Sequence, residues 1–187
     1  MITFSFPTNK STHFQFVREG FAHKWNSSKE ELFCELVKRF VETEGMTKES
    51  DILDAFDNIH QACLTEIDLN LTLKECVVTF MVLKERYRTF KYLIDTPNAV
   101  FDVNDKYVHL DGYQREIAIE HWPLGEHYFY NPEPMWDTLT RTFSDLRLNE
   151  YLGEEIWKRH PDFPTLDQLI TDYWAEEARQ AAHRRRR

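Results

Sequence analysis

The sequence predicts a mainly all-α fold, made of a three-helix core, additional C-terminal helices and one short extended excursion. Three long segments carry apolar residues at three- and four-residue steps, which is the spacing of a helix with one buried face. Helix-breaking residues are rare in these segments, because the 187-residue chain has only 5 Gly and its 7 Pro fall mostly after residue 96. The hydrophobic content of 42% is enough for a packed core and excludes a wholly disordered chain.

The first helix is expected from about Ser28 to Glu44. The polar residues just before it suit the N-cap position, and Glu30 and Glu31 in its first turn interact favourably with the helix dipole. Gly45 is a residue type at which helices commonly end. The apolar face of this helix contains Leu32, Phe33, Leu36, Val37, Phe40 and Val41.

The second helix is expected from about Ser50 to Glu66. Its apolar stripe contains Ile52, Leu53, Phe56, Ile59, His60 and Cys63. His60 lies at the edge of this stripe, where a packed, hydrogen-bonded histidine is the usual arrangement. We therefore expect His60 to be part of the core and not a metal ligand.

The third helix is expected to be the longest, from about Thr72 to Asp95. Thr72 and Glu75 have the spacing of a capping box, and Pro97 marks the end of the helix. Its apolar face contains Leu73, Cys76, Val77, Phe80, Leu83, Tyr87, Phe90 and Ile94. We expect the middle of this face to pack on the first two helices, with Phe80, Leu83, Tyr87 and Phe90 buried against Leu36, Phe40 and Phe56.

The pattern becomes irregular after the third helix. Alternating apolar residues on both sides of Asn104 and Asp105 predict the extended excursion, over residues 100–113. A short helix is then expected at residues 114–122 and a loop at 123–134. Three helical pieces are expected at residues 135–143, 148–158 and 166–180. The chain is thus divided into an N-terminal extended arm (1–22), a helical domain (23–144) and a C-terminal helical extension with a basic tail (145–187).

The cysteines and the N-terminus indicate an intracellular protein. Cys34, Cys63 and Cys76 are an odd number without CxxC spacing, and each lies in an apolar helical pattern. We expect three reduced thiols in the core. The N-terminal residues lack the basic and apolar regions of a signal peptide, and no stretch has the roughly 20 apolar residues of a membrane span. No membrane association is expected.

Basic residues gather in two places although the net charge is −9 and the pI is about 5.4. On a helical wheel, one flank of the third helix carries a basic strip, a further arginine lies on the other flank, and a lysine lies near the helix start. The chain also ends in four arginines. The candidate DNA- or partner-binding residues are therefore Lys74, Lys84, Arg86, Arg88, Lys91, Arg184, Arg185, Arg186 and Arg187.

Two interpretations of these residues remain open. The strip on the third helix is suited to phosphate contacts, but it is equally compatible with a solvated flank whose charges pair locally with acids such as Glu85. The arginine run is a nuclear-localisation element, a phosphate-binding arm or a solvated terminus. The acidic net charge disfavours general affinity for nucleic acid, because phosphates need a positive face.

One resemblance to a known family follows from the order of the aromatic and basic residues. The matching positions are Trp25, Leu83–Tyr87 (Leu-Lys-Glu-Arg-Tyr), Phe101–Asp102, Val108, the helix from Tyr113, and Glu133–Leu139. Over residues 23–144 this order resembles the Myb/SANT-like domains of the transposase-associated plant and fungal type. The position of Phe101 is commonly a tryptophan in that family. The resemblance implies that the third helix is a recognition helix that enters the DNA major groove.

No catalytic or metal site is expected. The sequence has no GxSxG, GxxxxGK[ST] or GxGxxG motif. His121 and His127, with Glu120 and Glu126, form the only dense group of histidines and carboxylates, and they lack the spacing of a zinc site. We therefore expect no enzyme activity, no cofactor, no metal and no small-molecule substrate.

The leading hypothesis is a nuclear protein-interaction adaptor with a Myb/SANT-like fold, which binds a protein partner and possibly contacts DNA through its third helix. One alternative is a sequence-specific DNA-binding protein with a role in transcription or derived from a transposon. Another is a helical scaffold or effector protein without a nucleic-acid role, and the cytoplasm is the alternative location. The net acidity favours a protein partner, whereas the basic strip favours DNA.

Overall fold

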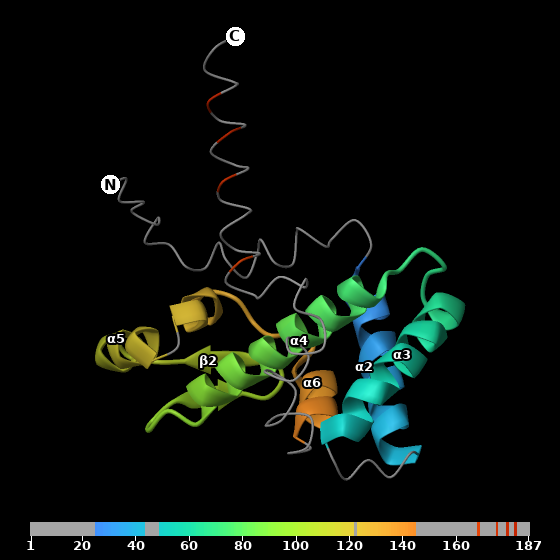
Figure 1. Ribbon diagram of the computed structural model, residues 1–187. Helices are drawn as coiled ribbons and strands as arrows, with labels where there is room; N and C mark the ends of the chain where they lie inside the picture. The colour runs from blue at the N-terminus through green and yellow to red at the C-terminus, as the bar shows by residue number, and fades with distance from the viewer. Residues whose placement is uncertain are drawn as a thin grey trace.

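The computed structural model describes residues 25–43, 49–121 and 123–144, and four isolated positions, Gln168, Ala175, Arg179 and Ala182. The chain is mainly helical, as predicted, with one small sheet (Figure 1). The elements in chain order are α2 (Ser27–Thr43), α3 (Glu49–Glu66), α4 (Leu73–Ile94), β1 (Val100–Asp102), β2 (Tyr107–His109), α5 (Gly112–His121), the 3₁₀ helix η1 (Pro123–Phe129) and α6 (Trp136–Phe143).

Local sequence signals set the ends of the long helices. Before α2, the Asn26 side chain accepts a hydrogen bond from the Lys29 backbone N–H at 2.9 Å. The predicted capping box of α4 is confirmed, because the Glu75 N–H donates to Thr72 Oγ1 at 3.2 Å and the Thr72 N–H donates to Glu75 Oε2 at 2.8 Å. After α4, Asn98 has a positive φ of 63°, which a continuing helix does not allow. These signals fix the start of α2 and both ends of α4, and all three predicted long helices have nearly the predicted bounds.

The extended excursion is an antiparallel hairpin. Phe101 on β1 pairs with Val108 on β2, and residues 103–106 form the turn. Asp102 Oδ1 accepts hydrogen bonds from the backbone N–H groups of Asn104 (2.8 Å) and Asp105 (3.1 Å). An aspartate that bonds to the amides following it is a common way to stabilise a turn. The prediction of an extended excursion is confirmed.

The prediction of a loop at 123–134 is wrong for its first half, which forms η1. Pro123 suits the first position of a helix, because its fixed φ is already helical. Tyr128 and Phe129 at the end of η1 are 2% and 3% exposed. Gly125 allows close approach, since a Cβ there would lie 3.2 Å from a methyl group of Leu93. Burial against α4 therefore stabilises a helical turn that the local sequence alone does not specify.

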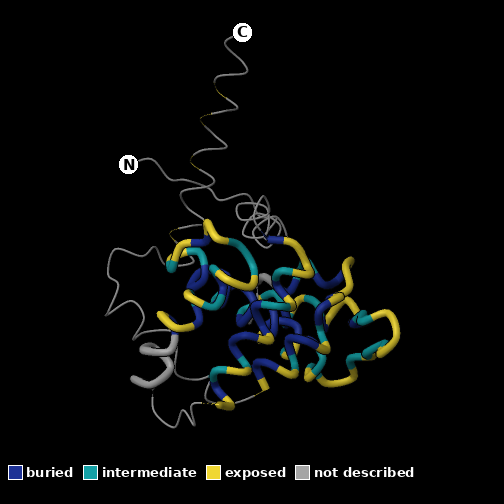
Figure 2. The backbone as a smooth tube through the Cα atoms, turned by 90° about the vertical axis from the view of Figure 1, so that its right-hand side faces the viewer, coloured by how far each residue is buried: buried dark blue, intermediate teal, exposed yellow. Residues whose placement is uncertain are grey.

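Helix α4 runs through two separate hydrophobic clusters, with α2 and α3 at one end and the hairpin and α5 at the other (Figure 1). The first cluster joins α2, α3, the first half of α4 and α6. The second cluster contains Phe90, Leu93, Val108, Leu110, Ala118, Tyr128 and Phe129. Figure 2 shows the buried residues in the middle of the molecule and the exposed ones on turns and outer faces. The helix α4 is therefore the centre of the fold.

The predicted core is largely confirmed, with one correction. Phe80, Leu83 and Tyr87 are fully buried in the first cluster, and the Phe80 ring packs edge-to-face on Phe56 at 5.2 Å. Phe90 is also buried, but in the second cluster, where its ring lies 4.9 Å from that of Tyr128. Ten residues of helix separate Phe80 from Phe90, about 15 Å, which places Phe90 beside Tyr128 and Trp136 and away from Phe56.

A fourth helix completes the first cluster. Helix α6 packs against both α2 and α4, while α3 also contacts α2 and α4. Phe143 at the end of α6 lies 5.5 Å from the Phe80 ring, and Trp136 at its start stacks on Tyr87 at 5.6 Å. The expected three-helix packing is therefore a four-helix packing, with α6 contributing large aromatic side chains.

Two further predictions about the core, for the cysteines and for His60, are confirmed. Cys34, Cys63 and Cys76 are free and buried. His60 Nε2 lies 2.8 Å from the Leu71 carbonyl oxygen, so the ring is hydrogen-bonded within the fold. Trp25 is 6% exposed and packs edge-to-face on Phe33.

The N-terminal arm (1–22) lies outside the described residues, and so does the C-terminal extension (145–187) except for four positions. Among the helices that the structure describes, none combines the length and the apolar character needed to cross a bilayer.

Candidate partner or nucleic-acid interface

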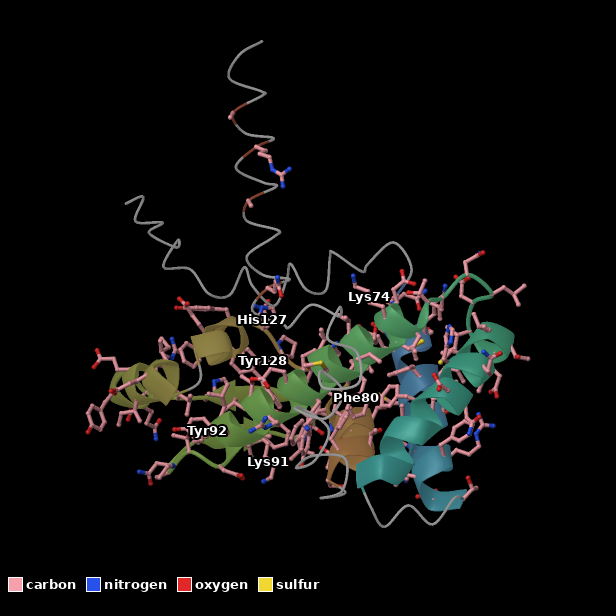
Figure 3. The ribbon with its side chains drawn as sticks, in the orientation of Figure 1. Lys74, Phe80, Lys91, Tyr92, His127 and Tyr128 are labelled. Carbon is pink, nitrogen blue, oxygen red and sulfur yellow. The ribbon has the colours of Figure 1, made fainter. Side chains whose placement is uncertain are left out.

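The five predicted basic residues of α4 do not form one surface. Lys74, Arg88 and Lys91 are exposed, whereas Lys84 is 8% and Arg86 is 4% exposed. Lys74 and Lys91 lie toward opposite ends of the helix (Figure 3). Seventeen residues separate them, which is about 25 Å along a helix. The arginines 184–187 lie outside the described residues.

The prediction that Lys84 belongs to an exposed strip is wrong. Lys84 lies four residues after Phe80 and three before Tyr87, so it shares the face of these buried aromatic residues. Burial lowers the pKa of its ammonium group to about 8, and the positive charge of Arg88 acts in the same direction. No carboxylate among the described residues forms an ion pair with it. Lys84 is therefore a largely buried amine and not a ready phosphate contact.

Lys91 is exposed, but its charge is paired. Its Nζ lies 2.6 Å from Asp95 Oδ2, one helical turn away, and this hydrogen bond raises the pKa of Lys91. Both side chains are about half exposed, with 48% and 57% of their surface accessible. Such exposed pairs contribute little to stability, typically below about 1 kcal/mol. The pair does reduce the net positive charge that this end of α4 presents.

The prediction that Arg86 projects from the surface is also wrong. Its guanidinium binds Glu133 in a bidentate manner, with Nε–Oε2 at 3.0 Å and Nη2–Oε1 at 2.6 Å. Its third nitrogen, Nη1, donates to Glu30 Oε2 at 3.1 Å. A planar guanidinium matches a carboxylate in this way, which is why arginine is preferred in buried ion pairs.

Glu133 accepts further hydrogen bonds in the same cluster. The Tyr128 hydroxyl donates to its Oε2 at 2.6 Å, and the Met135 backbone N–H donates to its Oε1 at 3.1 Å. Burial by itself raises the pKa of Glu133, but the charge of Arg86 and these hydrogen bonds outweigh burial and lower it. Glu133 therefore stays ionised in the interior, with both oxygens bonded. We call Arg86, Glu133, Glu30 and Tyr128 the Arg86 cluster.

The Arg86 cluster connects four separate segments of the fold. Glu30 comes from α2, Arg86 from α4, Tyr128 from η1 and Glu133 from the segment before α6. Tyr128 belongs to the second hydrophobic cluster, while Met135, two residues after Glu133, belongs to the first. The cluster is thus positioned between the two halves of the core. Its bonds are made within the fold, so its role is structural.

The sequence contains a signal for the burial of Arg86 that the helical-wheel analysis did not use. Arg86 follows Leu83 by three residues and precedes Phe90 by four, so it is adjacent to the apolar face. A long cation at such a position needs a carboxylate partner. The partner cannot be chosen from the sequence, because there are 32 Asp and Glu residues.

Exposed apolar side chains concentrate at the other end of the molecule from α2 and α3. We call residues 95–131, which include β1, β2, α5 and η1, the hairpin lobe. It carries seven Asp and Glu but two Lys and Arg, a formal charge of −5 out of −9 for the chain. The large hydrophobic residues exposed in the described part are Leu69, Val100, Val103, Tyr113 and Tyr130, and all except Leu69 lie in this lobe.

No metal-binding arrangement is found in the described part of the chain, where no three His, Cys, Asp or Glu side chains come together suitably. No protein-family model, curated protein or solved structure matches this chain. The resemblance to Myb/SANT-like domains therefore stays a prediction that rests on the residues quoted for it.

Proposed function

We propose that this chain is a nuclear protein-interaction adaptor with a Myb/SANT-like fold and no catalytic activity. The observation that carries the proposal is the position of α4, the helix to which the resemblance assigns DNA recognition. It packs against α3, α6 and η1 and is buried along most of its length. A recognition helix needs a free face about as wide as the major groove, and α4 has no such face with a basic character.

The charges support the same conclusion. Phosphate binding depends on cations that are free to replace the counterions of DNA. Lys84 and Arg86 are in the interior, and Lys91 is paired with Asp95. With a net charge of −9, the chain repels a polyanion over most of its surface. A protein partner is therefore the favoured ligand of the folded part.

The nuclear location is proposed from the resemblance and from the arginine run at 184–187. A short cluster of arginines is typical of nuclear-localisation elements. Fusion of the chain to a fluorescent protein tests this part separately. Replacement of the four arginines by alanine is expected to move the fusion from the nucleus to the cytoplasm, and an unchanged distribution would contradict the assignment.

The function is tested by titrating the full chain with duplex DNA at several salt concentrations. We expect weak binding, and we expect Arg88→Ala/Lys91→Ala to leave the affinity and its salt dependence unchanged. Replacement of Arg39 and Arg141, which are exposed on other helices, is the matched control. Tight binding whose log–log salt slope falls by about two in the Arg88/Lys91 variant alone would overturn the proposal in favour of DNA recognition by α4.

A further inference from the structure

The hairpin has one face directed away from the core. Phe101 and Val108 are cross-strand partners, and both pack in the second hydrophobic cluster. Because side chains alternate along a strand, their neighbours Val100 and His109, which also pair, point to the opposite side. Val100 is 62% exposed and His109 is exposed. This face has no cover among the described residues.

Two more exposed apolar side chains lie near this face. Val103 follows β1 and is 63% exposed. Tyr113 is 73% exposed in the first turn of α5, and its neighbour Gln114 donates a hydrogen bond to the Pro97 carbonyl. That bond holds the start of α5 beside the residues that lead into β1. We call these three exposed residues of the lobe, Val100, Val103 and Tyr113, the hairpin face.

Within the described part of the chain, no strand pairs with the outer edge of β1. The sheet has two strands, and β2 packs toward η1, where the Tyr107 hydroxyl bonds to the Phe129 carbonyl. No backbone hydrogen bond within the described part reaches the other edge, that of β1. An open strand edge is a template for an extended segment of another chain, whose main-chain groups complete the ladder.

The charge around the hairpin face is negative. Asp105 in the turn and Asp111 after β2 are exposed, and the amides of the turn lower the pKa of Asp102. The two basic residues of the lobe are both engaged. Lys106 pairs with Asp137 at 2.9 Å, and the Arg115 guanidinium lies over the rings of Phe129 and Tyr130. The surface therefore attracts a cationic ligand and repels an anionic one.

We propose that the hairpin face binds an extended, basic segment of the partner protein, which adds to β1 as a third strand. Its apolar side chains contact Val100 and the exposed neighbours Val103 and Tyr113, and Lys or Arg side chains at its two ends face Asp105 in the turn and Asp111 after β2. The inference rests on the proposed adaptor function and names the surface and the partner chemistry. Because the lobe has a net charge of −5 out of −9 for the chain, an acidic peptide or DNA does not fit there.

The test uses a short synthetic peptide with a central run of Val and with Lys at both ends, and a control peptide in which Glu replaces Lys. Binding to the isotope-labelled full chain is followed by NMR, through the backbone amides of residues 99–113. We expect the Lys/Val peptide to shift these amides and the Glu/Val peptide to shift none. N-methylation of alternate peptide nitrogens should abolish binding, because it removes the donors of the added strand.

A matched pair of variants locates the site. Val103→Arg adds a positive charge on the hairpin face, whereas Leu69→Arg makes the same change at another exposed apolar residue, between α3 and α4 at the opposite end of α4 (Figure 1). We expect Val103→Arg to lower the affinity for the Lys/Val peptide by about ten-fold or more, and we expect Leu69→Arg to have little effect on it. Equal effects of the two variants, shifts that lie outside the lobe, or equal binding of both peptides would overturn the inference.

These outcomes are separate from a failure of the adaptor function. A chain that binds duplex DNA tightly through Arg88 and Lys91 contradicts the adaptor function, whatever the peptides do. A chain that binds DNA weakly and binds neither peptide at the hairpin face keeps the adaptor function and contradicts only the basic-strand inference.

Discussion

Arg86 and Glu133, separated by 47 residues in the sequence, form a bidentate ion pair at 3.0 and 2.6 Å in the interior of the protein. The exposed fractions of their side chains are 5% and 2%. The pair joins the central helix to the segment that leads into α6, and Glu30 and Tyr128 bind to it from two further segments. It explains why a residue predicted to contact a partner is instead part of the fold.

Removal of one member of this pair is expected to destabilise the protein strongly. Arg86→Met or Glu133→Gln leaves a buried group without its partner, which typically costs about 3–5 kcal/mol when an ion pair is broken on one side. Urea unfolding measures the change in the free energy of unfolding. Arg39→Ala, which breaks an exposed pair with Glu66 at 3.0 Å, is the control and should cost less than about 1 kcal/mol. Equal losses for buried and exposed pairs would contradict the structural role of the Arg86 cluster.

Acid should unfold the protein partly through Glu133. The pKa of this carboxyl is below its ordinary value of 4.5 in the folded state, so the unfolded chain takes up the proton first as pH falls. The stabilisation is therefore present above about pH 4.5 and is lost as pH falls through the lower folded pKa. Urea midpoints measured from about pH 6 to pH 3 should fall less steeply in Glu133→Gln than in the unaltered chain. An equal fall of the urea midpoint with pH in the two proteins would contradict the contribution of Glu133 to acid unfolding.

Lys84 should destabilise the protein at neutral pH. Its pKa of about 8 in the folded state is below the ordinary value of 10.5, so the unfolded chain holds the proton more tightly and stability rises as pH increases from 8 to 10.5. Lys84→Met keeps the apolar stem without the charge and should raise the free energy of unfolding by about 1–3 kcal/mol at pH 7. This gain in the free energy of unfolding should disappear above pH 10.5, the ordinary pKa that Lys84 has in the unfolded chain. A Met variant that is less stable at pH 7 would contradict this account.

The buried cysteines should resist thiol reagents in the folded state. Burial raises the pKa of Cys34 to about 12, and the pKa of Cys76 is also raised, first by its hydrogen bond with Cys63 and then by burial. The thiolate is the reactive form, so labelling at neutral pH should be slow and should follow global unfolding. Labelling is measured by mass spectrometry with and without denaturant. Rapid modification of any of the three in native buffer would show that this part of the core is open.

The elements that could be predicted from the sequence are those set by neighbouring residues. The capping box of Thr72 and Glu75 and the turn bonds of Asp102 each join residues at most three positions apart, and both agree with the prediction. The periodicity of α4 likewise predicts its length. Such signals are contained in a short window of sequence, so they need no knowledge of the fold.

The candidate site was harder to predict because its contacts are distant in sequence. Arg86 binds Glu30 and Glu133 across 56 and 47 residues, and nothing in the local sequence selects these two carboxylates. The division of the core is a similar case, since Phe90 packs on Tyr128 and not on the first helix. A helical wheel gives the direction of a side chain but not the elements that cover it. Lys84 and Arg86 were therefore assigned to the surface.

The central claim is that the basic residues of α4 belong largely to the interior and do not form a DNA-binding surface. Acylation of lysines by a water-soluble active ester, read by mass spectrometry with and without duplex DNA, tests it most directly. Because the lowered pKa of Lys84 changes its intrinsic reactivity, each lysine is compared with itself, and we predict that DNA changes the acylation rate of none of Lys74, Lys84 and Lys91. Slower acylation of Lys84 and Lys91 in the presence of DNA would contradict the account.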